Sequence, residues 1–309
     1  MTPKQRMITA MERGIPDRVP TFELEFQLAP ELIGKDFCVD RDFEGLTGKA
    51  LDDKIFENAK VLVEAYTLLE HDAICIQLKP ELVARTVEAI HRIAGDTFLL
   101  MAHGDGTFAI PDGDGMYELS YRMVDEPESV KAQAARMCDE AIARNDWLLR
   151  EGLDGFILCS DYCFNQGPFL SPQMFAEFIQ PYLARIIAAI REGGGYAIKH
   201  TDGNIMPILD QLVAANPHAL HSLDPMAGVD IRKVKELVGD KIALCGNVHC
   251  AAMQTGTEQD VVDSATYCMT WGKPGGGYVF ATSNIPFRGL PLERYELCLL
   301  YTSDAADEL

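Results

Sequence analysis

Short apolar runs alternate with helical patterns along most of this chain. Runs of about four to eight residues rich in Val, Ile, Leu, Phe and Ala are typical of buried strands. We expect such strands at residues 19–26, 72–77, 97–103, 155–159, 196–200, 219–222, 242–245 and 278–281. Between them, apolar residues recur at intervals near 3.6, which predicts helices. The helical stretches are 53–70, 80–95, 129–150, 172–191 and 258–271.

This alternation predicts an α/β fold. Eight strand–helix units are the pattern of a (β/α)8 TIM barrel, and a length of 309 residues suits one. A doubly wound open sheet is the alternative, but it normally carries a glycine-rich phosphate loop after its first strand, and none occurs here. We therefore expect a single barrel domain over residues 1–297.

Local signals refine this outline. Ser171-Pro172 has the residue types of a helix cap followed by proline at the first helical position, and Asn204 is expected to cap the next helix in the same way. Residues 104–121, rich in Asp and Gly, are expected to form a long loop after the third strand. Residues 298–309 look like a translated sequencing adapter, so we expect a non-native tail that cuts the final helix short.

Composition narrows the classes of function. The net charge is −20, so nucleic acid and anionic membranes are not expected partners. No signal peptide and no apolar run of transmembrane length is visible. Nine cysteines are scattered without a CxxC pair, which indicates a reduced, cytoplasmic location. Most of these cysteines are expected to be small core residues.

Polar residues gather where the expected strands end. In a barrel the carboxyl ends of all strands meet at one face, where the active site lies. The residues found there include most of the histidines, the commonest metal ligands and acid–base groups near neutral pH. The set is Glu23, Glu25, Gln77, His103, Asp161, His200, Asp202, His221, Asp224, Asn247, His249 and Thr282 to Asn284.

The stretch His200-Thr-Asp-Gly-Asn204 is the most informative about function. On an extended strand end, residues two apart point the same way, so His200 and Asp202 are expected to converge as two metal ligands. A third ligand is expected among His249, Cys250, Cys245, His221 and Glu25. A hydrogen-bonded core histidine is the structural alternative for His200, and an incidental loop pair is the alternative for His249-Cys250. Asp161 either orients a substrate or caps a helix, and Asp224-Pro225 has the residue types of a simple turn.

Longer motifs resemble one family. The motifs are residues 1–18 with Asp17-Arg18-Val-Pro20, Gly167-Pro168-Phe-Leu-Ser171-Pro172, His200-Thr-Asp-Gly-Asn204, Pro225-Met-Ala-Gly228 with Asp230, Gly246-Asn-Val248, and Pro274-Gly-Gly-Gly-Tyr278. With them, the chain from about residue 2 to residue 294 resembles the uroporphyrinogen decarboxylase superfamily, which also contains zinc-dependent methyltransferases that act on methylated corrinoid proteins. The resemblance implies a (β/α)8 barrel.

The chain departs from both branches of that superfamily. True decarboxylases have an arginine-rich stretch after the first strand, whereas this chain has Phe22-Glu-Leu-Glu-Phe26, whose charge repels a polycarboxylate. The decarboxylases' aspartate has no match at Gln77-Leu78, and their last histidine is absent from Ser283-Asn-Ile-Pro286. The methyltransferase branch is closer. Its His-x-Cys zinc motif corresponds to His200 and Asp202, and Thr282-Ser283 stands where its second cysteine is expected.

The resemblance therefore implies a metal-assisted methyltransferase that works with a corrinoid carried by a partner protein and acts on a small molecule. The metal is expected to be zinc or another divalent ion. Two alternatives remain open: decarboxylation of uroporphyrinogen or of a smaller acid, and a non-catalytic barrel that binds a corrinoid or a partner. The expected catalytic residues are Asp161, Glu25 and His103, the cofactor-binding residues Asn204 and Asn247, and the metal ligands His200, Asp202 and His249.

Overall fold

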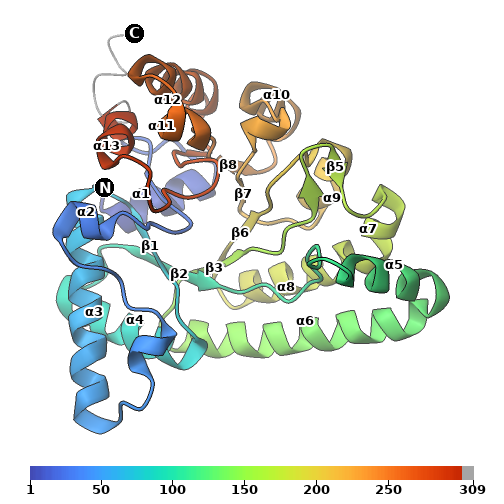
Figure 1. Cartoon of the computed structure of the whole chain (residues 1–309), viewed down its shortest axis with the longest axis horizontal. Coiled ribbons are helices and arrows are strands. Elements are labelled where there is room, and N and C mark those ends of the chain that lie inside the picture. The colour runs from blue at the N-terminus through green and yellow to red at the C-terminus, as the bar shows by residue number, and fades with distance from the viewer. Residues whose placement is uncertain (301–309) are drawn as a thin grey trace.

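The computed structural model describes residues 1–300, which are built around a curled parallel sheet (Figure 1). Seven strands pair in the order β1-β2-β3-β6-β7-β8-β9, and every pair is parallel. A short antiparallel hairpin, β4–β5, follows β3 and was not expected. The strands are β1 (Ala73–Ile76), β2 (Leu99–His103), β3 (Gly155–Leu158), β4 (Cys163–Phe164), β5 (Gly167–Pro168), β6 (Tyr196–His200), β7 (Ala219–His221), β8 (Ala243–Cys245) and β9 (Tyr278–Val279).

Helices surround this sheet, and the amphipathic ones occur where the spacing predicts them (Figure 1). No described helix combines the length and apolar character needed to cross a membrane. The α-helices are α1 (Pro3–Met11), α2 (Ala29–Ile33), α3 (Gly48–Leu68), α4 (Pro80–Ala94), α5 (Gly115–Asp125), α6 (Pro127–Arg150), α7 (Pro172–Phe178), α8 (Gln180–Glu192), α9 (Leu209–Ala214), α10 (Ile231–Val238), α11 (Cys250–Thr255), α12 (Glu258–Gly272) and α13 (Leu292–Leu300).

Two predictions about helices and loops need correction. The single helix expected over 172–191 is broken at Ile179, because Pro181 has no N–H and its ring does not fit inside a continuous helix. The loop expected over 104–121 is shorter, since α5 begins at Gly115. The predicted cap at Ser171 is confirmed, because its side chain accepts a hydrogen bond from the Met174 N–H. The tail expected from residue 298 begins inside α13, and residues 301–309 lie outside the described chain.

The prediction of a β-strand over residues 19–26 is wrong. Within the described residues, this segment forms one isolated parallel bridge, between Thr21 and Phe280 beside β9, and one backbone bond from the Asp72 N–H to the Thr21 carbonyl beside β1. Pro20 has no N–H, and the Thr21 N–H donates to the Asp72 carboxylate instead of to a neighbouring strand. The parallel sheet of the predicted barrel is thus confirmed, whereas its closure by an eighth strand stays a prediction.

Two apolar clusters cover the two faces of the sheet. Side chains alternate along each strand, so Ala197 joins the outer cluster under the helices while Ile198 joins the inner one. Helix α1 adds Met7 and Met11 to the inner cluster, and the Lys4 N–H donates to the Thr97 carbonyl just before β2. The inner core is therefore sealed at the amino ends of the strands, which leaves the carboxyl ends for chemistry.

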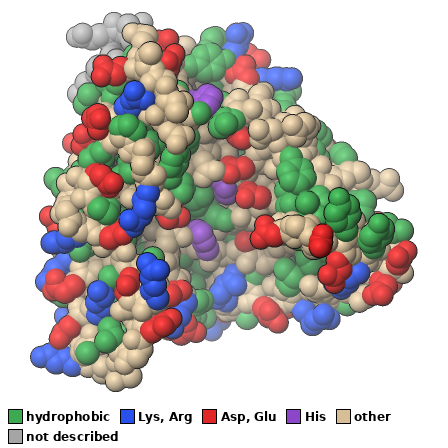
Figure 2. All heavy atoms as spheres, in the orientation of Figure 1, with side chains coloured by type: hydrophobic (Ala, Val, Ile, Leu, Met, Phe, Trp, Pro, Cys, Tyr) green, Lys and Arg blue, Asp and Glu red, His purple; other side chains and the backbone are tan. Residues whose placement is uncertain are grey.

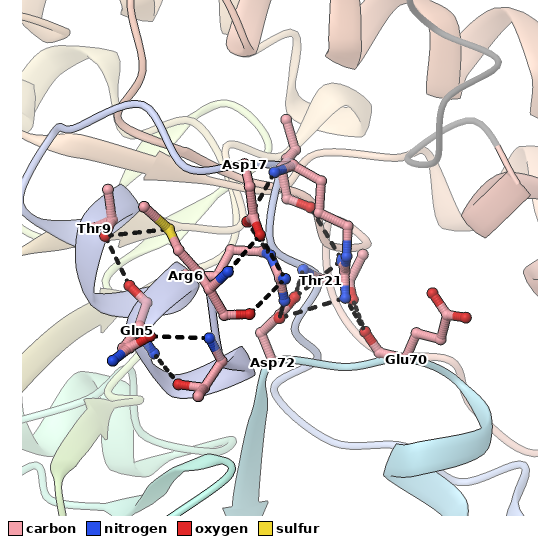
Figure 3. Close-up of polar contacts among 11 residues, drawn as sticks. Gln5, Arg6, Thr9, Asp17, Thr21, Glu70 and Asp72 are labelled. Atoms are coloured by element: carbon pink, nitrogen blue, oxygen red, sulfur yellow. Dashed lines mark hydrogen bonds and ion pairs between the residues drawn. The ribbon is translucent and has the colours of Figure 1, made fainter.

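A buried ionic cluster attaches α1 to the start of β1 (Figure 3). Asp72 is fully buried, and its carboxylate lies 2.5 Å from Arg6 Nη1 and 3.1 Å from Arg18 Nη1. Asp17, which is 43 % exposed at its side chain, binds the other edge of Arg6 at 2.6 Å. Asp72 also holds the Thr21 N–H at 2.8 Å. One carboxylate thus orients the helix, the 17–21 segment and the first strand together.

Asp72→Asn is expected to lower the free energy of unfolding by about 3 kcal/mol, because it leaves two arginines near a buried site without their shared carboxylate. Asp17→Asn is the matched control: its partly exposed ion pair is worth less than about 1 kcal/mol. Urea unfolding followed by circular dichroism measures both values. Equal losses in the two variants would contradict a central role for Asp72.

Candidate metal centre

Three side chains from two adjacent strands converge at the carboxyl ends. Asp161 follows β3, His200 is the last residue of β6, and Asp202 lies two residues further. His200 Nε2 lies 3.7 Å from Asp161 Oδ1 and 3.8 Å from Asp202 Oδ1. The Asp202 N–H also donates to Asp161 Oδ1 at 2.9 Å, which fixes the two loops relative to each other. The predicted convergence of His200 and Asp202 is confirmed.

This group fits a divalent metal ion. One ligand atom from each residue lies within 4.8 Å of the others. Two donors bound at about 2.1 Å to one tetrahedral metal lie roughly 3.4 Å apart, so distances of 3.7 and 3.8 Å need only a small contraction. One imidazole and two carboxylates form a harder donor set than one with thiolates, which suits zinc and also harder divalent ions.

Hydrogen-bond donors hold the Asp202 carboxylate. Ser222 Oγ donates to Asp202 Oδ1 at 2.8 Å, and Asn284 Nδ2 donates to Asp202 Oδ2 at 2.5 Å. Burial raises the pKa of Asp202 to about 6, and the nearby carboxylates Asp161 and Asp224 add to this rise while Ser222 opposes it. Asp202 therefore carries its charge at neutral pH against an energetic cost, which a bound cation would relieve.

His200 is buried behind the two aspartates. Its Nε2 faces them, and its Nδ1 lies 2.8 Å from Nδ1 of His221. Burial lowers the pKa of His200 well below its ordinary value, and the neighbouring His221, Lys199 and His103 lower it further. The ring is therefore neutral at pH 7, the form in which imidazole binds metals.

A buried ion pair lies on the other side of the same strand. Lys199 is fully buried, and its Nζ contacts Asp105 Oδ2 at 3.0 Å, the Leu158 carbonyl at 3.0 Å and the Ser160 carbonyl at 2.9 Å. It also lies 4.1 Å from the centre of the Tyr162 ring. Burial raises the pKa of Asp105, but Lys199 and several hydrogen-bond donors outweigh it and lower that pKa to about 2.

Two further predicted residues lie near this centre. His103 ends β2 and is exposed, and it is close enough to His200 to affect its pKa. Desolvation of the ring lowers the pKa of His103, and the carboxylates of Glu25 and Asp105 oppose that effect electrostatically. Figure 2 shows histidine side chains along a hollow in the middle of this face, next to a group of acidic side chains.

The other predicted residues lie in different surroundings. Asn204 Oδ1 accepts a hydrogen bond from the Met206 N–H, as a capping residue does. Asn247 Nδ2 donates to the Leu223 carbonyl at 2.6 Å. His249 caps α11, since its Nδ1 accepts from the Ala251 N–H. Asn247 and His249 line a separate cavity of about 570 Å³ beside α10, α11 and α12, outside the Asp161–His200–Asp202 group.

Sequence reasoning missed the supporting residues. Lys199 sits in an apolar strand, and a lysine there signals a buried partner, but nothing in the sequence identified Asp105. Asn284 was in the predicted set of strand-end residues and lies in the segment after β9, but the support that it and Ser222, just after β7, give to Asp202 depends on how the strands pair. Asp161 was expected to orient a substrate or cap a helix, whereas the structure brings it to the metal group.

Comparisons with known proteins agree with this architecture. A family model described as uroporphyrinogen decarboxylase (URO-D) matches residues 112–294, more than half of the chain. A solved structure, a methyltransferase from Methanosarcina mazei, superposes with a TM-score of 0.75 at 15 % identity and covers 99 % of each chain. At that identity it supports the fold alone. No curated protein matches the sequence.

Two other solved structures are only loosely similar. N-acetylneuraminate lyase from Mycoplasma synoviae gives a TM-score of 0.41 at 11 % identity, over 86 % of this chain and 67 % of the other. D-allulose 3-epimerase from Methylomonas sp. gives 0.47 at 15 % identity, over 79 % and 85 %. Neither carries an argument about this site.

The Asp202 carboxylate should reduce the stability of the metal-free protein at neutral pH. Its pKa rises from 3.8 to about 6 on folding, so the folded state binds the proton more tightly and loses stability as the pH rises from about 4 through 6. Asp202→Asn is expected to stabilise the metal-free protein at pH 8 by on the order of 1 kcal/mol, after allowance for partial solvent exposure.

Urea unfolding of the metal-free protein at pH 4, 6 and 8 measures this gain, which should vanish at pH 4. Glu88→Gln, an exposed carboxylate in the middle of α4, is the control and should leave stability unchanged. A loss of stability in Asp202→Asn at pH 8 would show that its hydrogen bonds outweigh the cost of its charge.

Proposed function

Because the chain belongs to the uroporphyrinogen decarboxylase family, we propose that it is a metal-assisted methyltransferase that acts with a corrinoid protein. The observation that carries the proposal is the Asp161–His200–Asp202 group, whose ligand atoms lie within 4.8 Å of one another. We take the fold to be the (β/α)8 barrel of that family, formed by residues 1–297, with the 20–22 segment in the place of an eighth strand.

In this proposal Asp161, His200 and Asp202 hold a divalent metal. Such a metal, when bound, supplies Lewis acidity that lowers the pKa of an acceptor thiol. His103, whose pKa burial lowers, would accept the proton that the thiol loses, and the electrostatic influence of Glu25 would favour the resulting imidazolium. The thiolate sulfur would bond to the methyl carbon, and the electron pair of the broken carbon–cobalt bond would remain with the partner's corrinoid.

The donor set of one imidazole and two carboxylates, which suits a divalent metal, favours the metal-dependent branch of the family over decarboxylation. The acidic residues of the first segment favour it as well. Burial raises the pKa of Glu23 to about 8, so Glu23 is mostly uncharged at pH 7, whereas the Glu25 carboxylate acts electrostatically on His103 and residues 20–28 contain no arginine. Negative charge here disfavours a substrate with many carboxylates.

Metal content is the first test. Purified protein dialysed against zinc is expected to retain about one zinc per chain, whereas His200→Ala and Asp161→Asn retain at least tenfold less at equal protein concentration. His218→Ala is the matched control, because His218 lies at the other end of β7, where its Nδ1 accepts from the Ala197 N–H. Elemental analysis measures the content. Equal zinc in all four proteins would contradict the assignment.

Turnover is the second arm of the same test. Wild-type protein with methylcobalamin and a small alkyl thiol should demethylate the corrinoid, as followed by its absorbance, and the metal-free protein should be at least tenfold slower. Chromatography after incubation with uroporphyrinogen tests the alternative. Decarboxylated product with no demethylation of methylcobalamin would replace this proposal with a decarboxylase.

A further inference from the structure

A cavity of about 390 Å³ lies at the carboxyl ends of β2 and β3, between α4 and α6. Its volume is within the range of small-molecule sites, roughly 300–1,000 Å³. Leu78 and Val83 near the start of α4, Ala102 of β2 and Leu148 of α6 give it apolar walls. His103, which acts electrostatically on His200, also lines it, on the side of the metal group.

Arg144 of α6 is a partly buried cation on the wall of this cavity. Its Nε donates to Asn145 Oδ1 at 3.3 Å, and its Nη2 donates to the Asp105 carbonyl at 2.9 Å. A guanidinium has five N–H groups, so three of them, including both on Nη1, have no partner among residues 1–300. Within the same residues Arg144 forms no ion pair, although the sequence has 47 acidic residues.

The acidic residue among the described lining residues, Asp105, does not neutralise Arg144. Arg144 contacts the backbone carbonyl of Asp105, whereas the Asp105 carboxylate pairs with Lys199 at 3.0 Å. The same carboxylate accepts hydrogen bonds from the N–H groups of Gly106 and Ser160. Asp105, Lys199 and Arg144 together therefore carry one net positive charge beside the cavity.

The charge of Arg144 is maintained at an energetic cost. Desolvation lowers the pKa of Arg144, and the charge of Asp105 offsets this only in part. Arginine nevertheless stays protonated in proteins, so the fold holds a positive charge partly away from water. A bound anion would relieve that cost, because an opposite charge favours the charged form of a group.

A purely structural role for Arg144 does not explain its charge. That role would be to attach the loop after β2 to α6 through the Asp105 carbonyl. Asn145 already attaches this loop, since its Nδ2 donates to the Gly104 carbonyl at 2.8 Å. A neutral amide donor serves that purpose as well as a guanidinium does, and it is less costly to bury.

We propose that this cavity binds a small monocarboxylate with an apolar body, whose carboxylate accepts hydrogen bonds from Arg144. Parallel N–H groups of a guanidinium match the two oxygens of a carboxylate. Leu78, Val83 and Leu148 contact the apolar body, and one unpaired arginine matches one negative charge. The inference goes beyond the proposed function, because neither a metal nor a corrinoid takes part in this binding.

Hexanoate is the probe, since it has one carboxylate and a short apolar chain. Titration of the metal-free, full-length protein, followed by saturation-transfer difference NMR, is expected to give a Kd in the millimolar range. Metal is left out so that a carboxylate bound to zinc is not counted. Hexanamide, which has no charge, should bind at least tenfold more weakly. An absence of saturable hexanoate binding, or displacement of hexanoate by inorganic phosphate at lower concentration than by hexanoate itself, would overturn the proposal.

Variants of Arg144 locate the site. Arg144→Gln, which keeps a donor for the Asp105 carbonyl, should weaken hexanoate binding at least tenfold. Arg144→Lys should fall in between, because it keeps the charge but not the planar fork. Arg136→Gln is the matched control, an exposed arginine of the same helix outside the cavity lining, and should bind as wild type does. Equal affinity in Arg144→Gln and Arg136→Gln would contradict the assignment.

Ala109→Phe tests the cavity with Arg144 intact. Ala109 lines the cavity from an exposed loop position, so a larger side chain can occupy the cavity without displacing the core. This variant should also bind hexanoate at least tenfold more weakly, and wild-type affinity would overturn the proposal even if Arg144→Gln does not fold, which circular dichroism checks. Zinc retention, measured in the same proteins, tests the metal centre separately, so either proposal can fail while the other stands.

Discussion

The buried pair of Lys199 and Asp105 is the constraint on which the Asp161–His200–Asp202 group depends. Lys199 reaches across to the carbonyls of Leu158 and Ser160, and Asp105 accepts the Ser160 N–H, so the end of β3 is tied to β6 from the outer face. Asp161 follows directly, which brings its carboxylate to His200. Breaking such a pair leaves a buried charge uncompensated, at a cost of about 3–5 kcal/mol, so the separation of the two ligands is strongly determined.

Side chains alternate along a strand, so β6 presents residues on both faces of the sheet. Lys199 points out to the ion pair, and His200 points in to the ligands and to His221. On the inner side, Ser222 after β7 and Asn284 in the segment after β9 donate hydrogen bonds to the Asp202 carboxylate. The segments at the carboxyl ends of β3, β6, β7 and β9 therefore all contribute to one site, and their side chains hold one another in place by hydrogen bonds.

The sequence predicted the part of this site that is local. The spacing of His200 and Asp202, and the apolar run before them, were enough to place both on one side of a strand end. Asp161 was also predicted at this face, but its place beside His200, and the role of Asp105, depend on the pairing of strands far apart in the chain, which local periodicity does not contain. The prediction of the first strand was wrong because Pro20 has no N–H and the Thr21 N–H donates to the Asp72 carboxylate. Neither group can then pair with a neighbouring strand, although the apolar pattern of the segment is that of a strand.

The resemblance to the methyltransferase branch implies a cysteine at the position of Asp202, and the surroundings of Asp202 suit a carboxylate. Ser222 and Asn284 donate to different oxygens of Asp202, an arrangement that a single sulfur atom cannot reproduce. Those donors keep an anion in a site where burial works against its charge. The aspartate is therefore part of a matched set, and an oxygen-rich set shifts metal preference toward harder ions.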